Sequence, residues 1–175
     1  YSTITKVDRA RCHAGIGSYL LSHKGEHRLE AVGDAHDAHV EQVAHHLGTA
    51  ASLVREMGPV RGVPDDLAEQ ALVWVAEAAE RAARDDIQPA AARLFGLALA
   101  LVGDEPSPQR VQLLLGRGLA RARLFQRSDA RADIDAALTD AEECGHAAGF
   151  AHGVLVRGIA EELDDDFAAA VASYD

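Results

Sequence analysis

The sequence Arg117-Gly118-Leu119-Ala120 returns forty residues later as Arg157-Gly158-Ile159-Ala160, which indicates an internal repeat. An alanine follows each glycine after twelve residues, at Ala130 and Ala170. A repeat of this length is typical of stacked helical hairpins, none of which can bury its apolar face alone. We expect the small residues to let the two helices of each hairpin approach closely.

The composition of the 175-residue chain favours an all-α protein, because aromatic residues make up only 5% and there are only five prolines. The chain carries 17 Lys and Arg against 28 Asp and Glu, a net charge of −11. This charge argues against a nucleic-acid partner. The sequence shows neither an apolar run of membrane-spanning length nor a signal peptide. We therefore expect a cytoplasmic protein without a membrane partner, whose two cysteines, Cys12 and Cys144, are reduced.

Apolar residues at helical spacing predict helices over about residues 5–23 and 36–57, with a firm stop at Gly58-Pro59. Ser107-Pro108 is a typical start of a later helix, and Ser128 is expected to cap the helix after it. No segment indicates a strand. The sequence thus predicts an N-terminal helical hairpin at 1–58 and a repeat region at 65–175, with repeats at about 65–103, 107–145 and 146–175.

The third predicted repeat ends at Asp175, inside its second helix, and the chain begins at Tyr1 rather than at a methionine. We therefore expect the chain to be a section of a larger protein. Repeat arrays need a polar terminal cap, so two copies could pair through an uncapped apolar end of this kind.

The spacing of small and bulky residues in the repeat region resembles the tetratricopeptide repeat. The period of thirty-nine to forty residues is longer than the usual value of about 34, and the closing proline is missing from the first two copies. The resemblance implies stacked antiparallel hairpins in a right-handed superhelix over roughly residues 65–175. The residues that carry it are Trp74, Ala79, Ala91, Phe95 and Ala98 in the first copy, Gly118, Ala130, Ile134 and Ala137 in the second, and Gly158, Ala170 and Tyr174 in the third.

In that family the first helix of each repeat lines a concave surface that holds a partner. This surface is mostly apolar here and lacks the Lys and Asn residues that clamp a terminal carboxylate in some members, so we expect a helix or an extended apolar segment to bind it. Its occupant would be a separate protein or an adjacent domain of the parent chain. The alternative is that neighbouring hairpins cover it. The partner-binding residues that the resemblance implies are Gln112, Leu115, Leu119, His152, Leu155 and Ile159.

Two N-terminal stretches resemble the helical region behind the ATPase module of large bacterial signalling proteins. These stretches are Asp8-Arg9-Ala10-Arg11-Cys12-His13 and His45-His46-Leu47, the latter followed by Ala50-Ala51. Such regions occur in actinobacterial-type multidomain adenylate or guanylate cyclases and in ATPase-coupled transcription regulators. The resemblance implies a regulatory relay region of such a protein.

Seven of the nine histidines lie between His13 and His46, which raises a metal-binding alternative. His36 and His39 could share a helix face, with His46 two turns beyond His39. Zinc needs three or four convergent ligands, however, and the adjacent His45 and His46 point about 100° apart on a helix, which disfavours one shared site. We therefore assign no metal ligand and no cofactor. A ligand- or metal-sensing domain in the His-rich first third stays as the alternative function.

Catalytic motifs are not evident in the sequence. The adjacent pair Cys12-His13 lacks the opposed geometry and oxyanion hole of a nucleophilic site. The acidic run at residues 161–166 lacks the glycine and spacing of an EF-hand loop, and no GxxxxGK[ST] phosphate loop occurs. The sequence therefore predicts a fragment that is not itself an enzyme.

Overall fold

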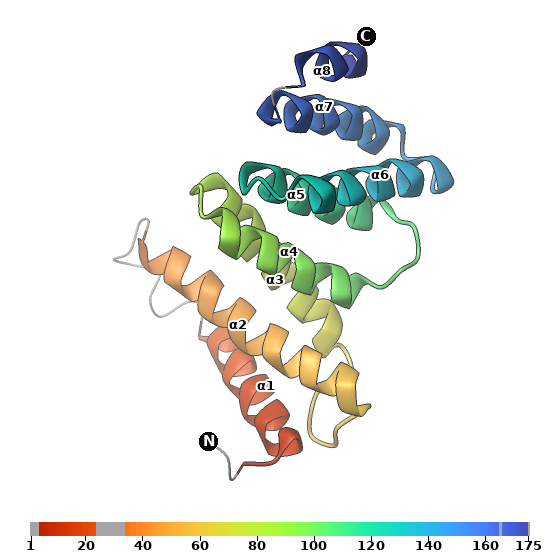
Figure 1. Ribbon diagram of the computed structural model, residues 1–175. Coiled ribbons are helices and arrows are strands. Elements are labelled where there is room, and N and C mark those ends of the chain that lie inside the picture. The colour runs from red at the N-terminus through yellow and green to blue at the C-terminus, as the bar shows by residue number, and fades with distance from the viewer. Residues whose placement is uncertain (1–3, 24–33, 165, 175) are drawn as a thin grey trace. The chain divides into compact units, whose positions relative to one another are not determined.

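The computed structural model describes residues 4–23, 34–164 and 166–174, with the backbone alone at residues 34–37, 167, 168 and 174. Within these residues the regular structure is entirely α-helical, and no strand occurs among them (Figure 1). The predicted all-α fold is therefore confirmed. The described helices are α1 (Lys6–Ser22), α2 (Asp34–Met57), α3 (Leu67–Arg84), α4 (Gln88–Val102), α5 (Pro108–Arg123), α6 (Arg127–Glu143), α7 (Ala147–Leu163) and α8 (Phe167–Tyr174).

The chain forms two compact units, unit 1 (Tyr1–Ala78) and unit 2 (Ala79–Asp175), and α3 begins in the first and ends in the second. The Gly58–Pro64 loop, where the sequence suggests a boundary, follows the end of α2 and lies inside unit 1. None of the described helices combines the length and the apolar character needed to cross a membrane. Cys12 and Cys144 are both free thiols.

In unit 1, α1 and α2 pack as an antiparallel hairpin around buried alanines and aliphatic side chains. Gly17 is needed at the crossing, because a Cβ atom there would overlap the side chain of the fully buried Leu47. Thr5 caps α1 by accepting a hydrogen bond from the Asp8 amide at 3.1 Å. Arg11 Nε donates to the carbonyl of Arg61 at 2.8 Å and so ties the loop after α2 to α1.

In unit 2, each helix from α4 to α8 packs on the next, and α5 also packs on α7. Val111 and Leu115 of α5 lie opposite Gly149 and Gly153 of α7, so these two helices run parallel. The hairpins are therefore stacked, as the repeat predicts, with the first helix of one hairpin on the first helix of the next.

Gly118 has the role that the repeat predicts for it. A Cβ atom at this position would lie 3.0 Å from Ile134 Cγ1 and 3.3 Å from the carbonyl oxygen of Ala130. These contacts are tighter than ordinary packing allows. The glycine therefore lets α5 approach α6 closely where Ala130 and Ile134 face it. The side chain of Tyr174, which would fill the place of Ile134 in the last repeat, lies outside the described residues.

Three turns between consecutive helices close in the same way, each with a residue at positive φ. The amides of Ile87, Gln126 and His146 donate to the carbonyls five residues earlier, at 2.8, 2.9 and 2.8 Å. This is the hydrogen bond of a Schellman motif. The residues at positive φ just before these amides are Asp86 (61°), Phe125 (58°) and Gly145 (67°).

The prediction that Ser128 caps α6 is wrong. The helix begins one residue earlier, at Arg127, and Gln126 occupies the cap position without a side-chain capping hydrogen bond. The preceding Schellman turn determines this start, because the Gln126 amide already bonds back to α5. Ser107, by contrast, caps α5 as predicted and accepts from the Arg110 amide at 3.2 Å.

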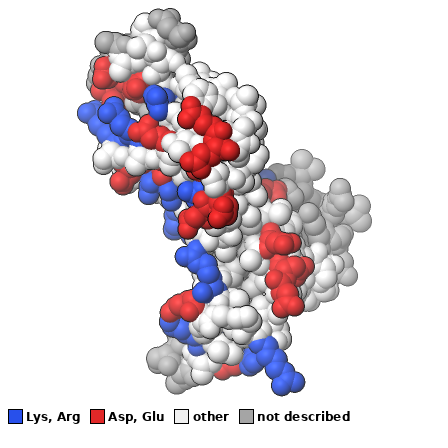
Figure 2. All heavy atoms as spheres, turned by 90° about the vertical axis from the view of Figure 1, so that its right-hand side faces the viewer, with Lys and Arg blue, Asp and Glu red and all other residues white. Residues whose placement is uncertain are grey.

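A buried ion-pair network holds α5 against α6. Asp133, only 4% exposed, accepts from Arg117 Nε at 2.9 Å and Nη2 at 2.6 Å, and from Arg121 Nη1 at 2.6 Å. Asp140 pairs with Arg110 Nε at 2.7 Å nearer the other end of α6. The face drawn in Figure 2 likewise has Lys and Arg side chains beside Asp and Glu side chains.

Arg157, the repeat equivalent of Arg117, has a different partner. Its Nη2 atom lies 2.8 Å from Asp135 Oδ1 on the preceding helix, α6. Within the third repeat, Ser173 stands where the second has Asp133, and Ser173 donates to Glu161 at 2.7 Å. The repeated arginine therefore joins the two helices of one hairpin in the second repeat and two successive hairpins in the third.

Candidate functional site

The residues predicted to bind a partner divide between the core and the surface of unit 2. Leu115 is 1% exposed, and a Cβ atom on Gly153 of α7 would lie 3.6 Å from its Cδ2. It is therefore a core residue, because α7 covers this part of α5, and its assignment to an open surface is corrected. The other five predicted residues keep some exposure: Gln112, His152 and Leu155 are exposed, and Leu119 and Ile159 are half-buried.

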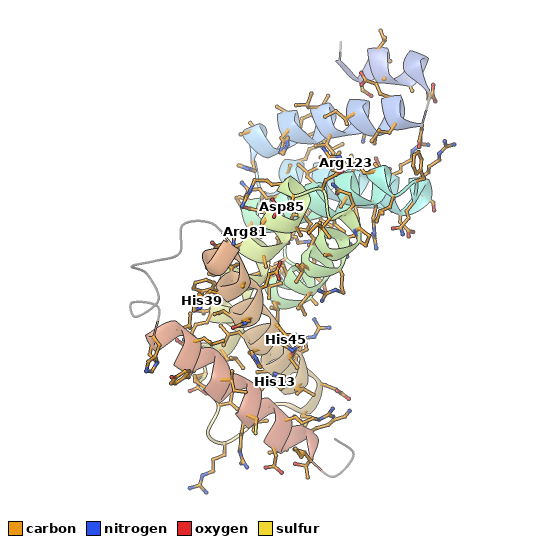
Figure 3. All side chains as sticks on the ribbon, turned by 90° about the vertical axis from the view of Figure 1, so that its left-hand side faces the viewer. His13, His39, His45, Arg81, Asp85 and Arg123 are labelled. Atoms are coloured by element: carbon orange, nitrogen blue, oxygen red, sulfur yellow. The ribbon has the colours of Figure 1, made fainter. Side chains whose placement is uncertain are left out.

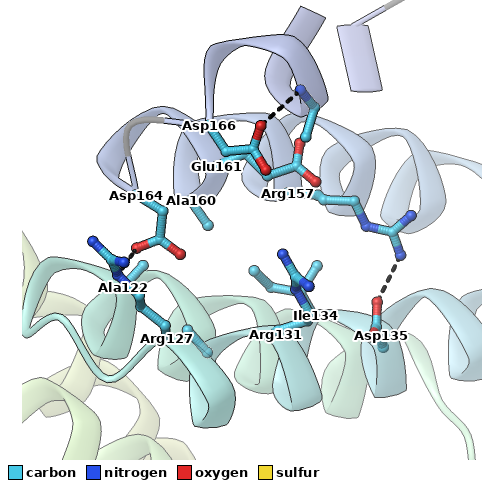
Figure 4. Close-up of a pocket in the computed structure, with 12 residues that line it drawn as sticks. Ala122, Arg127, Arg131, Ile134, Asp135, Arg157, Ala160, Glu161, Asp164 and Asp166 are labelled. Carbon is cyan, nitrogen blue, oxygen red and sulfur yellow. Dashed lines mark hydrogen bonds and ion pairs between the residues drawn. The ribbon is translucent and has the colours of Figure 1, made fainter. Parts of the chain in front are cut away.

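A groove of about 410 Å³ lies between α6 and α7 in unit 2 (Figure 4). Arg157 contributes to it and follows Leu155 by two residues, which places the two side chains on nearly opposite sides of α7. The groove is thus distinct from the surface implied by the repeat resemblance. It is lined by Ala122, Arg127, Ala130, Arg131, Ile134, Asp135, Arg157, Ala160, Glu161, Asp164, Asp166 and Ala169.

The floor of the groove is apolar and tightly packed. Ala122, Ala130 and Ile134 are between 2% and 3% exposed, so they close the groove from below. Ala160 and Ala169 line it as well. The hollow exists because small side chains stand where larger ones would fill the space between the two helices.

Two ion pairs join α6 and α7 across the groove. Arg127 Nε lies 2.7 Å from Asp164 Oδ1, and Arg157 Nη2 lies 2.8 Å from Asp135 Oδ1. Figure 4 shows these pairs on either side of Arg131. They brace the groove, which favours a preformed shape over one that opens on binding.

Arg131 is the lining cation that makes no ion pair within the described part of the chain. It is exposed, and its side chain extends from α6 towards α7 in Figure 4. The two carboxylates without an ion pair have hydrogen-bond donors, because Ser173 donates to Glu161 at 2.7 Å and the Ala169 amide donates to Asp166 at 3.2 Å. The guanidinium of Arg131 is therefore the group most available to a ligand carboxylate.

Phe125 is not one of the lining residues, but it lies in the turn between two of them, Ala122 and Arg127. It is 70% exposed, and its φ of 58° is in the left-handed region. Bulky residues rarely adopt this conformation, and the equivalent place in the next turn is taken by Gly145. An exposed aromatic side chain on a strained backbone is a recognised sign of a functional position.

Sequence reasoning missed Phe125, Arg127 and Arg131. The tetratricopeptide pattern directs attention to the first helix of each repeat, whereas the groove combines the second helix of one repeat with the first helix of the next. Arg127 and Asp164 are far apart in the sequence, so no local motif predicts their ion pair. The available signal was a phenylalanine in a turn position that elsewhere holds Asp86 and Gly145.

A second cluster of functional side chains lies in unit 1, where His13 of α1 meets His45 and His46 of α2 (Figure 3). One nitrogen from each ring can be chosen so that all three lie within 4.8 Å of one another. The Nδ1 atoms of His13 and His46 are 3.0 Å apart. The angle between adjacent helical positions disfavours a site shared by His45 and His46, yet both rings lie near the ring of His13 across the hairpin, with centroids 5.7 and 5.0 Å from it.

His39, which the sequence also suggested as a ligand, is not part of this cluster. The ring of His39 lies edge-on to that of Trp74, with centroids 6.1 Å apart. The side chain of His36 lies outside the described residues.

Burial lowers the pKa of both His13 and His46 below the ordinary histidine value. For His13, His45 and then Arg9 add to the effect, and for His46 the further causes are His13 and His45. Lowered pKa values favour the neutral imidazole at pH 7. In that form one ring nitrogen donates and the other accepts a hydrogen bond or binds a metal ion.

Comparisons of the chain with protein-family models, with curated proteins and with solved structures find no match. The fold and the two sites define the protein as an all-α chain of packed helical hairpins, with a braced, charged groove in unit 2 and a histidine cluster in unit 1.

Proposed function

We propose that this chain is a non-catalytic helical-repeat module that binds a segment of a partner protein, or of an adjacent domain of its parent, in the α6–α7 groove. The observation that carries the proposal is an apolar floor beside the guanidinium of Arg131, which makes no ion pair with another described residue. The exposed Phe125, in the turn that precedes α6, adds support. Arginine and aromatic residues are enriched among the residues that dominate binding at protein interfaces.

A peptide segment suits this groove better than a small apolar ligand does. Small-molecule sites are mostly enclosed by hydrophobic and aromatic side chains, with few polar groups. Here the lining includes three arginines and four carboxylates around a narrow apolar floor. A segment with an acidic residue beside a small apolar one would match it, because the carboxylate could pair with Arg131 while the apolar side chain covers Ala130.

The proposal is tested by panning a library of displayed short peptides against the whole chain. Enriched peptides should carry Asp or Glu next to an apolar residue. Arg131→Ala should weaken their binding at least about tenfold, because a hydrogen bond to a charged group contributes about 1.5–3 kcal/mol. Arg93→Ala, which removes an exposed arginine from α4, is the matched control and should leave binding unchanged.

Two results would overturn this assignment. One is a library that yields no peptide binding above that to an unrelated helical protein. The other is a set of peptides that bind the Arg131→Ala variant as tightly as the original chain. Because Arg131 is exposed and makes no ion pair with another described residue, its removal should not disturb the fold.

The proposal extends to the parent, which would be a cytoplasmic bacterial ATP-dependent signalling protein such as a nucleotide cyclase or a transcription regulator. Its support is the sequence resemblance around Arg9–His13 and His45–Leu47. If the module regulates such a parent, its deletion should change ATP turnover or cyclic-nucleotide production in a protein that remains folded. Unchanged rates would reject this regulatory role and leave the docking role to the peptide experiment.

A further inference from the structure

We propose that His13, His45 and His46 form a binding site for a divalent transition-metal ion, with zinc as the best-suited metal, and that the ion joins α1 to α2. Three imidazoles that converge from two helices are the protein donor set of known three-histidine zinc sites, in which the fourth position is open to water. The site lies wholly in unit 1, so it is independent of the groove proposed for unit 2.

The distances fit a site that needs only small side-chain adjustments. Zinc–nitrogen bonds of about 2.0–2.1 Å in tetrahedral geometry place two ligand nitrogens about 3.3 Å apart. The Nδ1 atoms of His13 and His46 are already 3.0 Å apart, and the ligand nitrogens of the three rings lie within 4.8 Å of one another. His45 is exposed, so its ring can turn towards the other two without disturbing the core.

The donor set also indicates the class of metal. Imidazole nitrogen suits zinc, copper and nickel, whereas calcium and magnesium require oxygen ligands. The one neighbouring thiol, Cys12, precedes His13 directly and therefore points to a different side of α1. A site of three nitrogens with water in the fourth position is the expected arrangement.

The positive charge of Arg9 opposes binding of the ion. Arg9 stands one helical turn before His13 and is close enough to lower the pKa of His13. Its long side chain can move its guanidinium towards solvent while its stem stays in place, which reduces the repulsion. We therefore expect an Arg9→Gln variant, which lacks this charge, to bind zinc more tightly than the original chain does.

The test is a calorimetric titration of the whole chain with zinc, after a chelator has removed any bound metal. We expect one zinc ion per chain at this site, a rise in melting temperature with zinc, and intense visible absorption when Co²⁺ replaces zinc in tetrahedral geometry. His13→Ala and His46→Ala should each weaken binding at least about tenfold, because the loss of even an outer-sphere partner costs about 10–100-fold in affinity. The exposed His152→Ala in unit 2 is the matched control and should change nothing.

His45→Ala provides a second test in case the half-buried His13 or His46 is necessary for folding. This side chain is exposed, so its removal should leave the melting temperature of the metal-free chain unchanged while weakening zinc binding. The proposal is overturned if the chain does not bind zinc, or if the variants His13→Ala, His45→Ala and His46→Ala bind it as tightly as the control. A Co²⁺ spectrum no stronger than that of the hydrated ion would overturn it as well.

Discussion

At the scale of single residues, Phe125 has a left-handed backbone conformation that residues with a Cβ atom rarely adopt. Its φ of 58° is close to the 67° of Gly145, which ends the next helix in the same kind of turn. A left-handed conformation costs a residue with a Cβ atom about 1–2 kcal/mol relative to glycine. Because the ring is 70% exposed, burial does not offset this cost in the isolated chain. Under the proposed function, contact of the ring with a bound peptide would offset this cost.

Phe125→Gly should therefore raise the free energy of unfolding of unit 2 by about 1 kcal/mol, because it removes backbone strain and little packing. The same change should weaken peptide binding. Chemical denaturation and peptide titration measure the two effects. Gly145→Ala is the reciprocal control: there is room for its Cβ atom, so only strain acts and stability should fall by about 1 kcal/mol. A less stable Phe125→Gly variant would contradict the account.

Asp133 illustrates the opposite case, a polar residue required by packing. Asp133→Ala should lower the free energy of unfolding by about 3 kcal/mol or more, because it leaves the partly buried guanidiniums of Arg117 and Arg121 without their partner. Asp135→Ala removes a more exposed pair with Arg157 and should cost about 1 kcal/mol or less. Similar losses in the two variants by urea denaturation would show that the network around Asp133 is not a main support of the hairpin.

At the scale of elements, the close approach of α5 and α6 depends on Gly118. Gly118→Val should destabilise unit 2 by about 1–3 kcal/mol, because the new side chain meets Ile134 and the Ala130 carbonyl. Gly96→Ala in α4 is the comparison, since a Cβ atom there has ordinary contacts at 3.7 Å or more. It should stabilise the helix by about 0.5–1 kcal/mol. Melting curves of both variants test the prediction, which fails if Gly118→Val is as stable as the original chain.

The helices themselves were predictable from local signals in the sequence. Apolar periodicity placed α1 and α2, and Ser107-Pro108 marked the start of α5. The prediction that Ser128 caps α6 failed because a hydrogen bond in the preceding turn fixes the start of α6 one residue earlier, at Arg127. Local propensity cannot report such a constraint from the neighbouring helix.

The candidate sites were less predictable, because they depend on contacts between distant segments. The burial of Leu115 follows from how closely α7 approaches α5, which glycines at 149 and 153 permit and a family pattern does not state. The convergence of His45 and His46 depends on the packing of α1 against α2, which brings His13 next to both. The groove forms only where α6 packs on α7. In the sequence alone, its arginines therefore look like ordinary surface charges.

At the scale of the whole molecule, the two compact units carry two different kinds of site. Unit 1 holds the three histidines on one hairpin, and unit 2 holds the braced groove between successive hairpins. This division predicts independent behaviour. Zinc should stabilise the α1–α2 hairpin without needing peptide, and Arg131→Ala should weaken peptide binding without changing zinc affinity.

Methyl NMR of the whole chain, titrated with a peptide selected by display, would locate the peptide on unit 2. We expect the methyl signals of the groove residues Ala130, Ile134, Ala160 and Ala169 to shift with peptide concentration, and Arg131→Ala to reduce the shifts. Shifts confined to Leu119 of α5 and to Leu155 and Ile159 of α7, with the groove signals unchanged, would place the partner outside the groove and reject the proposed function.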